Sequence, residues 1–455
     1  MFLEKVKSDG LAHLSYVIGD GQQCAVIDPR RDCRIYLHLA RQHNARVTHI
    51  FETHRNEDYV IGSTGLAHRS GAKVYHGRWM DFEYGHEVDD GDSFRLGSLE
   101  LEAIHTPGHT DESISIAACD RTFGGEPVAV FTGDALFIGD VGRTDFYPER
   151  ARKVAGKLFD SIHEKILPLG DGVILCPAHG AGSVCGSGMA DREFSTLGYE
   201  RRFNPRLQMG REEFIDYKVN ENHYIPPYFK KMEQYNLEGP PVFDNIADPG
   251  PMDAVEFAEH RDEDNMLMLD VRSPEAHAGA LIPDSFGIPL NMVPAFAGYF
   301  LPYDNPIGII AEDGEATKTA ARYLFRMGYE ETVGYLANGL PAWEVGGRDF
   351  QSIPQITARE LLRRRRDDEA MTLLDVRSRD EWETGHLSGA NHLYVGYLPD
   401  KLDQIPDGRP IVTFCGSGRR ALIAASYLRR NGFEQVQNCL GSMAACKKLG
   451  CEVVT

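Results

Sequence analysis

A repeat in the C-terminal part of the sequence is the feature that most limits how this chain can fold. Residues 268–273, MLDVRS, return as residues 373–378, LLDVRS, and residues 321–329 return with a similar pattern as residues 425–433. The offset between the copies, about 105 residues, is too long for the stacked units of a solenoid. It indicates two tandem domains of about 100 residues each.

Each copy has the alternation of an α/β domain. Short apolar runs, among them MLMLDV, IGIIA and IVTFC, predict buried strands of a parallel sheet. The amphipathic segments TKTAARYLFRMG and ALIAASYLRRNG predict helices that end at Gly328 and Gly432. Alternation of strand and helix predicts a parallel sheet with helices on both faces.

Residues 1–240 follow a different pattern, in which hairpin signals come first. HLSYVIGDGQQCAVID places GDG between two alternating runs, and SFRLGSLELEAIHTPGH has Gly97 at a turn. The segment CRIYLHLARQHN predicts a helix before the strand VTHIFET. This mixture predicts an α+β domain or a layered sandwich, and the Pro- and Gly-rich residues 236–252 predict a linker into the repeats.

Composition limits the partners of the chain. Its 455 residues exceed a single core, which stops growing near ~250–300 residues, and they fit about three domains. Lys and Arg number 48 against 68 Asp and Glu, a formal net charge of −20, so we expect neither nucleic acid nor a membrane as a partner. We find no long apolar run, no secretory signal and nine scattered cysteines. We therefore expect a cytoplasmic protein with reduced thiols.

Metal-ligating residues follow several of the apolar runs in the N-terminal part. His54 comes after VTHIFE, His109 lies in TPGHT, Asp134 follows VFTG and His179 lies in CPAHG. Ligands at the ends of separate strands converge at one edge of a sheet, so these four residues predict a metal site. A lone histidine at a strand end is more often structural, and the weight of the prediction comes from the combination.

These motifs, THxxxD, TPGHT, FTGDALFIGDVGRTDF and PAHG in this order, resemble the metallo-β-lactamase fold. The run GDALFIGDVGRTDF resembles the persulfide dioxygenase branch more than the zinc hydrolases. The resemblance implies an αββα sandwich over residues 1–240. The family's usual HxHxDH motif is altered here, because Asn56 and Tyr59 replace two histidines, and this argues against a binuclear zinc site.

The residues that remain, His54, His109 and Asp134, match the ligand set of non-haem Fe(II) oxygenases, two imidazoles and one carboxylate with open positions. The resemblance to persulfide dioxygenases implies one Fe(II) per chain at these three positions. Five further residues are candidates for positions around the metal or substrate. They are Asp58, Tyr59, Arg143, His179 and Cys185.

These five have competing interpretations. Asp58 and His179 would orient a ligand or a bound water. Tyr59 would hydrogen-bond near the iron or only fill space beside His54. Arg143 would offset the charge of a persulfide or form an internal ion pair. Cys185 would relay sulfur or be an ordinary loop thiol.

A second candidate centre lies in the second repeat, where the strand IVTF leads into the loop Cys415–Gly416–Ser417–Gly418–Arg419–Arg420. A cysteine at the start of a Gly-rich loop before a helix meets backbone N–H groups and the positive end of the helix dipole. Arg419 and Arg420 add two charges, and these effects favour a thiolate or persulfide anion.

This CxxGxR loop, with LDVR and GHLSGA upstream, resembles the rhodanese sulfurtransferases. The first repeat has Ala311 opposite Cys415, three carboxylates in its loop and no arginine there. The resemblance implies an inactive rhodanese-like domain over residues 253–350 and an active one over residues 355–455.

The order of the domains resembles the bacterial fusions of a persulfide dioxygenase with a rhodanese. The resemblance implies that iron and O2 oxidise a low-molecular-weight thiol persulfide to sulfite and thiol, while Cys415 transfers sulfane sulfur and forms or uses thiosulfate, in sulfide detoxification. It also makes a homo-oligomer plausible. Two alternatives stay open, a mononuclear zinc thioester hydrolase of the glyoxalase II kind fused to a rhodanese, and a non-oxidising sulfur-carrier or sulfide-sensing protein that acts through Cys415.

Overall fold

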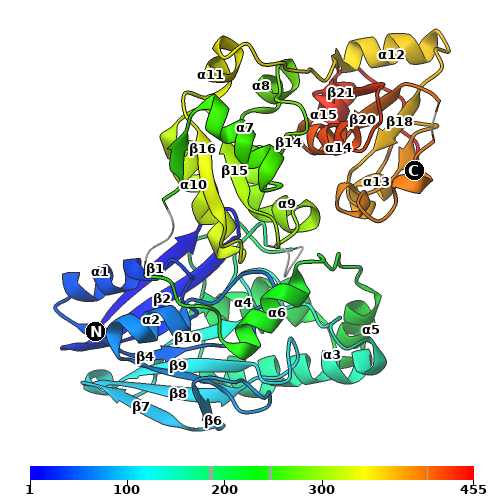
Figure 1. Ribbon diagram of the computed structural model, residues 1–455. Helices are drawn as coiled ribbons and strands as arrows, with labels where there is room; N and C mark the ends of the chain where they lie inside the picture. The colour runs from blue at the N-terminus through cyan, green and yellow to red at the C-terminus, as the bar shows by residue number, and fades with distance from the viewer. Residues whose placement is uncertain (184–187, 245–247, 407) are drawn as a thin grey trace. The chain divides into compact units, whose positions relative to one another are not determined.

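A computed structural model describes residues 1–183, 188–244, 248–406 and 408–455 (Figure 1). The chain divides into two compact units. Unit 1 comprises Met1–Ile246 with Arg326–Gly328, and unit 2 comprises Ala247–Phe325 with Tyr329–Thr455. Cys185, one of the predicted site residues, lies outside the described residues.

Unit 1 is built on two sheets. The first has six strands in chain order: β1 (Phe2–Ser8), β2 (His13–Asp20), β3 (Gln23–Ile27), β4 (Arg46–Phe51), β5 (Lys73–Gly77) and β6 (His86–Val88). The second has the order β11-β10-β9-β8-β7, with β7 (Ser93–Leu96), β8 (Leu99–His105), β9 (Ile114–Asp120), β10 (Pro127–Gly133) and β11 (Ile174–Pro177). The two expected hairpins are present, as the antiparallel pairs β2 with β3 and β7 with β8.

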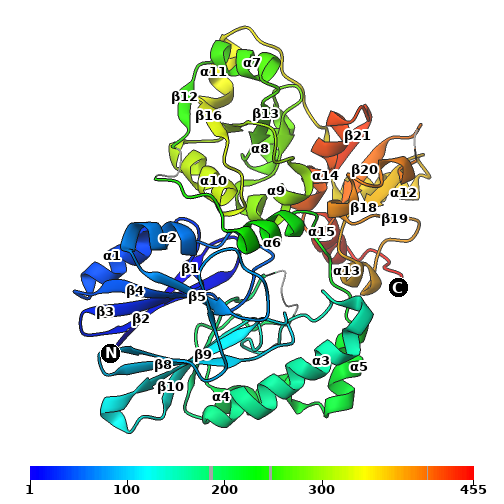
Figure 2. The ribbon, with the colours of Figure 1, turned by 60° about the horizontal axis from the view of Figure 1, so that its bottom comes forward.

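Helices cover the outer face of each sheet in unit 1 (Figure 2). The helices are α1 (Arg34–Gln42), α2 (Ser63–Ser70), α3 (Ala151–Asp160), α4 (Leu197–Phe203), α5 (Arg211–Asn220) and α6 (Phe229–Glu238). Alternate residues of a strand point to opposite faces, so one strand serves two cores. Ile18 packs between the sheets with Phe131, whereas its neighbour Val17 packs with Tyr36 of α1.

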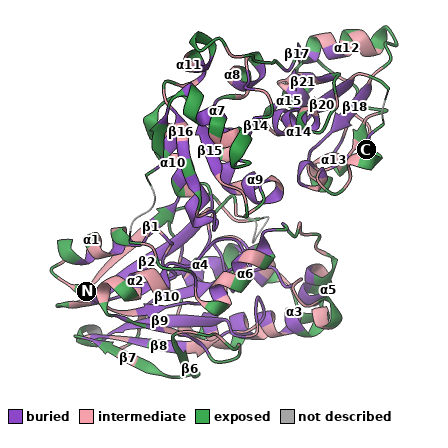
Figure 3. Ribbon diagram, in the orientation of Figure 1, coloured by how far each residue is buried: buried purple, intermediate pink, exposed green. Residues whose placement is uncertain are grey.

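A third core completes the layering of unit 1. It joins Val130 of β10 to Leu158 of α3 and Phe214 of α5. Three cores separate four layers in the order helix, sheet, sheet and helix, which is the αββα sandwich that the motifs predict. The central strands are almost fully buried, whereas the helices keep exposed residues on their outer faces (Figure 3).

Unit 2 contains two parallel five-stranded sheets of identical order. In the first, β12-β16-β15-β13-β14, the strands are β12 (Gly250–Met252), β13 (Leu267–Asp270), β14 (Phe286–Gly287), β15 (Ile307–Ile310) and β16 (Thr332–Leu336). In the second, β17-β21-β20-β18-β19, they are β17 (Gln355–Thr357), β18 (Thr372–Asp375), β19 (Asn391–His392), β20 (Ile411–Phe414) and β21 (Val436–Leu440). The sequence repeat therefore corresponds to a structural repeat.

The helices of unit 2 repeat less regularly than its strands. The first half has α7 (Ala254–Glu263), α8 (Pro274–Gly279), α9 (Val293–Phe300), α10 (Gly314–Arg326) and α11 (Gly339–Val345). The second half has α12 (Ala358–Arg366), α13 (Arg379–Glu383), α14 (Arg419–Arg430) and α15 (Ser442–Lys448). In the described part of the chain, no helix is long and apolar enough to cross a membrane.

The segment predicted as a linker, residues 236–252, is shorter in the structure. Its first three residues belong to α6, which continues to Glu238 and ends before Gly239, and its last three form β12. Asn236 is only 1% exposed, because this face of α6 is buried within unit 1. Composition indicated a loop here, and burial of one helical face extends the helix into it.

Candidate metal centre and sulfur-transfer loop

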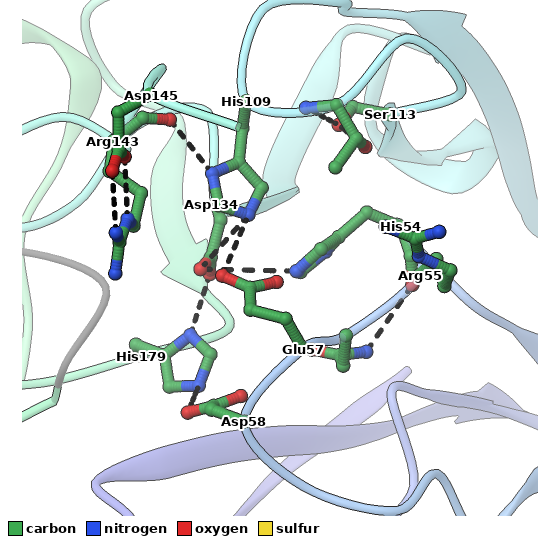
Figure 4. A network of polar contacts seen from close by, with 12 residues as sticks. His54, Arg55, Glu57, Asp58, His109, Ser113, Asp134, Arg143, Asp145 and His179 are labelled. Atoms are coloured by element: carbon green, nitrogen blue, oxygen red, sulfur yellow. Dashed lines mark hydrogen bonds and ion pairs between the residues drawn. The ribbon is translucent and has the colours of Figure 1, made fainter. Parts of the chain in front are cut away.

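The three predicted ligands meet at one place in unit 1. His54 follows β4, His109 follows β8 and Asp134 follows β10, so each lies just beyond the end of a strand. Their ligand atoms all lie within 4.8 Å of one another. His54 Nε2 and His109 Nε2 lie 3.8 Å and 3.7 Å from Asp134 Oδ2, and all three residues are at most 2% exposed (Figure 4).

The same three atoms have no hydrogen-bond partner in the described part of the structure. His54 Nε2, His109 Nε2 and Asp134 Oδ2 are each buried without one. Buried polar atoms are almost always hydrogen-bonded, and a cluster of orphaned atoms needs an explanation. Two imidazole nitrogens and a carboxylate oxygen are donors that suit iron and other transition metals. The residues therefore fit a bound metal ion.

Partners behind the two histidines leave Nε2 facing the site. His109 Nδ1 donates to the carbonyl oxygen of Arg143 at 3.0 Å. His54 Nδ1 lies 3.0 Å from Thr53 Oγ1, whose own hydrogen is donated to Asp28 Oδ2 at 2.7 Å. A histidine that donates from Nδ1 presents the lone pair of Nε2, as a metal-ligating imidazole requires.

Asp134 is held by a chain of buried groups. Its Oδ1 accepts from His179 Nδ1 at 2.7 Å, and His179 Nε2 lies 3.1 Å from Asp58 Oδ2 (Figure 4). Burial alone would lower the pKa of His179, but Asp134 and Asp58 on its two sides raise that pKa well above its usual value. Asp134 stays ionised, because the neighbouring histidines hold its pKa below the usual range against the effect of burial. His179 thus contacts a candidate ligand, and Asp58 contacts His179 in turn, while neither residue joins the cluster.

The altered HRNEDY segment is stabilised by a residue far away in the sequence. Asn236 Nδ2 donates to the carbonyl oxygens of Asn56 and Tyr59, each at 2.7 Å, and Asn236 Oδ1 accepts from Ile61 N at 2.9 Å. The side chain of Asn56 turns back, and its Nδ2 donates to the carbonyl oxygen of His54 at 3.3 Å. Helix α6 therefore fixes the backbone of this loop.

Tyr59 packs beside the cluster. Its ring stacks on His13 with ring centres 3.9 Å apart, and it is 1% exposed. Of the two roles that the sequence left open for Tyr59, the structure shows the one in which its ring fills space beside the cluster. Its hydroxyl oxygen remains without a hydrogen-bond partner among the described groups.

Glu57 is a site residue to which sequence analysis assigned no role. Its Oε1 lies 3.5 Å from His109 Nε2, and the residue is 1% exposed. The carboxylate points toward the candidate ligands (Figure 4). It opposes the effect of burial and, with Asp134, raises the pKa of His109 to about 9. The only signal in the sequence was an acidic residue between Asn56 and Asp58.

Arg143 forms the internal ion pair that was one of its two interpretations. Its guanidinium makes two 2.7 Å hydrogen bonds to Asp145 and lies over the rings of Phe146 and Phe229. The residue is 0% exposed. Its backbone carbonyl accepts from His109, so Arg143 contacts the candidate metal centre through its main chain.

In unit 2 the loop after β20 places a backbone N–H group against the Cys415 sulfur. Gly418 N–H donates to Cys415 Sγ at 3.0 Å, and Cys415 N–H donates to Ser442 Oγ at 3.1 Å. Gly418 has φ of 101°, in the left-handed region that suits glycine. Helix α14 begins at the next residue, so its N-terminus faces the sulfur side of the loop.

The two arginines of the loop have different surroundings. Arg419 is exposed, whereas Arg420 forms a two-pronged ion pair with Glu381 of α13, at 2.6 and 2.7 Å. Although burial opposes it, Arg420 lowers the pKa of Glu381 to about 2. The Arg420 guanidinium also lies close to the loop backbone, because its Nη2 would be 3.4 Å from a Cβ atom placed on Gly416. Its positive charge therefore lies beside the loop that carries Cys415.

The corresponding loop of the first repeat has another arrangement. Ala311 occupies the position that follows the strand, and helix α10 begins at Gly314. Asp313 Oδ1 accepts from Ala316 N–H at 2.8 Å, so this carboxylate occupies the helix N-terminus. Glu312, Asp313 and Glu315 are exposed. An anion would meet negative charge here.

Two family models match the chain in the order of these centres. The metallo-beta-lactamase superfamily matches residues 8–179, and the rhodanese-like domain matches residues 253–345 and 357–449. Fold and site thus define a metallo-β-lactamase-fold domain with a candidate metal centre, followed by two rhodanese-like domains.

Similar proteins narrow this class. The mitochondrial persulfide dioxygenase ETHE1 of Homo sapiens is 31% identical over 217 residues, which cover 46% of this chain and 76% of that protein. The Bos taurus protein of the same name is 31% identical over 221 residues, which cover 47% of this chain and 77% of that protein. The crystal structure of a metallo-beta-lactamase from Staphylococcus aureus subsp. aureus COL is 30% identical, has a TM-score of 0.66, and covers 74% of this chain and 98% of that one. The chain therefore belongs to the metallo-beta-lactamase superfamily, in the family of the ETHE1 persulfide dioxygenases, and carries two rhodanese-like domains.

Proposed function

We propose that unit 1 oxidises a low-molecular-weight thiol persulfide with O2 at one Fe(II), and that Cys415 transfers sulfane sulfur in the same chain. The observation that carries the first half is the set of three buried ligand atoms without hydrogen-bond partners, His54 Nε2, His109 Nε2 and Asp134 Oδ2. Similarity to ETHE1 persulfide dioxygenases supports this choice of reaction.

The oxidation balances without a further reductant. A persulfide RSS⁻, O2 and water give the thiolate RS⁻, sulfite and two protons, so the terminal sulfur loses the four electrons that O2 gains. Bound Fe(II) supplies the redox chemistry that lets O2 react with this sulfur. His54, His109 and Asp134 would hold the ion.

The chain's other residues fix these donors. Thr53 and the carbonyl of Arg143 hold the two imidazoles with Nε2 toward the ion. His179 donates to Asp134 Oδ1 and lies against Asp58, which keeps the carboxylate in one orientation and provides a buried site for a proton. A buried cluster also excludes bulk water from the reacting sulfur.

Sulfur transfer uses a different group. The Cys415 thiolate attacks the terminal sulfur of RSS⁻, and the bond between the two sulfurs of the donor breaks. RS⁻ is released, and Cys415 carries the transferred sulfur as an enzyme persulfide. Sulfite then takes the terminal sulfur, which releases thiosulfate and restores the thiolate. The Gly418 N–H group donates to Cys415 Sγ, and Arg420 lies beside the loop, so a hydrogen-bond donor and a cation lie near the sulfur that takes part in the transfer.

Oxygen uptake tests the oxidation. Protein reconstituted with Fe(II) and given glutathione persulfide should consume O2 and form one sulfite for each O2, counted with any thiosulfate formed from it. The His109→Ala variant should lose the metal and the uptake together. Iron-loaded protein that consumes no O2 with several thiol persulfides would overturn this half of the proposal. Two zinc ions in each chain of native protein would also contradict it.

A substitution at Cys415 tests the transfer separately. The Cys415→Ser variant should lose transfer of sulfur from thiosulfate to cyanide while it keeps the O2 uptake. The matched control is Cys451→Ser, which removes a half-buried thiol from the same repeat. Transfer that survives in Cys415→Ser would show that another group carries the sulfur.

A further inference from the structure

Glu57 is a buried carboxylate beside the candidate metal centre, on the loop between β4 and α2. We propose that Glu57 is a fourth protein ligand of the metal, so that the centre has two histidines and two carboxylates. This inference rests on the proposed metal centre at His54, His109 and Asp134. It adds a ligand from the altered HRNEDY segment. Glu57 lies between Asn56 and Tyr59, the two residues that replace the family's histidines.

The distances suit this assignment. Donor atoms bound to one metal at about 2.0–2.2 Å lie about 3.0–3.5 Å apart when they are neighbours. Glu57 Oε1 lies 3.5 Å from His109 Nε2, whereas the distances from Asp134 Oδ2 to the two histidine nitrogens are 3.7 and 3.8 Å. Glu57 therefore approaches His109 at least as closely as the candidate ligands approach one another.

A small movement completes the set. The group whose ligand atoms all lie within 4.8 Å comprises His54, His109 and Asp134, so the Glu57 carboxylate has to turn toward the other two. Glutamate has several rotatable side-chain bonds, which allow this turn without a change in the backbone. The backbone itself is held, because Asn236 binds the carbonyl oxygens of Asn56 and Tyr59 on either side of Glu57.

Charge gives an independent reason. Glu57 and Asp134 are 1% and 2% exposed, so both carboxylates would lie beside the ion in the protein interior. A divalent ion with one carboxylate would carry a net positive charge in this buried site, and two carboxylates would neutralise it. The second carboxylate therefore reduces the cost of placing the ion there.

A fourth ligand restricts the substrate. Each further protein donor would leave one position fewer on the ion for small molecules. The expected substrate is thus a persulfide that binds through its terminal sulfur alone, and chelating thiols should bind this centre weakly.

The test is metal binding by the full chain with Glu57→Gln, which removes the charge and keeps the shape. Loss of a ligand should lower the affinity for Co(II), measured by competition with a chelator, by more than about 100-fold, the upper end of what residues outside the ligand set contribute. The Co(II) absorption bands should shift as well. An affinity that falls less than tenfold with unchanged bands would overturn the inference.

Glu52→Gln is the matched control. Glu52 is as buried as Glu57 and lies just after the same strand, but its carboxylate accepts from Tyr84 at 2.8 and 2.9 Å. Its variant should keep the Co(II) affinity and the absorption bands of the native protein. An equal loss in both variants would show a general effect of buried glutamates and would contradict a specific role for Glu57.

A crystal structure of the Co(II)-loaded native chain decides the matter even if Glu57→Gln fails to fold. A Glu57 oxygen should lie within about 2.2 Å of the ion. An ion bound by His54, His109 and Asp134 with Glu57 beyond bonding distance would overturn this inference and leave the proposed function intact. An ion elsewhere, or none, would instead overturn the proposed metal centre.

Discussion

Asn236 shows how one residue can determine the shape of a site that it does not enter. It is 1% exposed and makes three hydrogen bonds to the backbone of residues 56–61. The Asn236→Ala variant leaves two carbonyls and one N–H group buried without partners, at about 1–3 kcal/mol for each unsatisfied group. We expect unit 1 to lose at least about 2 kcal/mol of unfolding free energy and the metal affinity to fall.

Urea unfolding of unit 1 measures this loss, because Trp79 reports unit 1 once Trp343 and Trp382 are replaced by Phe. The control is Gln234→Ala, an exposed residue on the same helix, and its effect should stay within about 0.5 kcal/mol. An Asn236→Ala protein with native stability and native metal affinity would show that the loop holds its shape without α6.

The same residues show what the sequence allows one to predict. His54, His109 and Asp134 each follow an apolar strand, and strand ends can be predicted from periodicity. The direction of the Glu57 side chain follows no such rule. It depends on a loop that is held by Asn236, a residue near the end of the unit 1 sequence. Contacts across such a separation form only when the chain folds, so a pattern within one segment does not reveal them.

At the scale of secondary structure, both repeats have a strand, a loop and a helix at the same place, but the loops differ. The second repeat has β20, the Cys415 loop and α14, and the first has β15, its own loop and α10. The first repeat lacks more than a thiol, since its loop carries three carboxylates and Asp313 occupies the N-terminus of α10. We expect Ala311→Cys, made in a Cys415→Ser chain, to transfer no sulfur from thiosulfate to cyanide. Each carboxylate repels the anionic donor and disfavours a thiolate.

The measurement is the formation of thiocyanate, with the native chain as the positive control. The variant with Cys415→Ser alone sets the background. Transfer above that background would contradict the interpretation of the first repeat as inactive. The strands and helices of both repeats could be predicted from their apolar runs, whereas the end of α6 could not, because burial within unit 1 outweighs the loop-like composition of residues 236–252.

At the scale of the whole molecule, the first repeat provides contacts to the helix that follows the Cys415 loop. Ser426 on α14 is 2% exposed. Its Oγ accepts from Gly287 N–H at 2.8 Å and lies 3.1 Å from His277 Nε2, while His277 Nδ1 lies 2.8 Å from Asp270. These are residues of the first repeat, so the buried chain Asp270–His277–Ser426 links the two repeats inside unit 2. The first repeat therefore supports α14, although it lacks a nucleophile of its own.

We expect Ser426→Ala to lower the stability of both repeats together. The substitution leaves the Gly287 N–H group and His277 Nε2 buried without a partner, which costs about 1–3 kcal/mol for each group. In a Trp79→Phe chain, Trp343 reports the first repeat and Trp382 the second. Urea unfolding followed in variants that keep one of these tryptophans should show both midpoints fall by the same amount, because a shared buried contact makes the repeats unfold as one cooperative unit. The exposed Ser352→Ala is the control and should leave both midpoints in place. The repeats would unfold independently if the urea midpoints reported by Trp343 and Trp382 differ in the parent chain. The same would follow if Ser426→Ala lowers only the midpoint reported by Trp382, and the contact would then not couple the repeats.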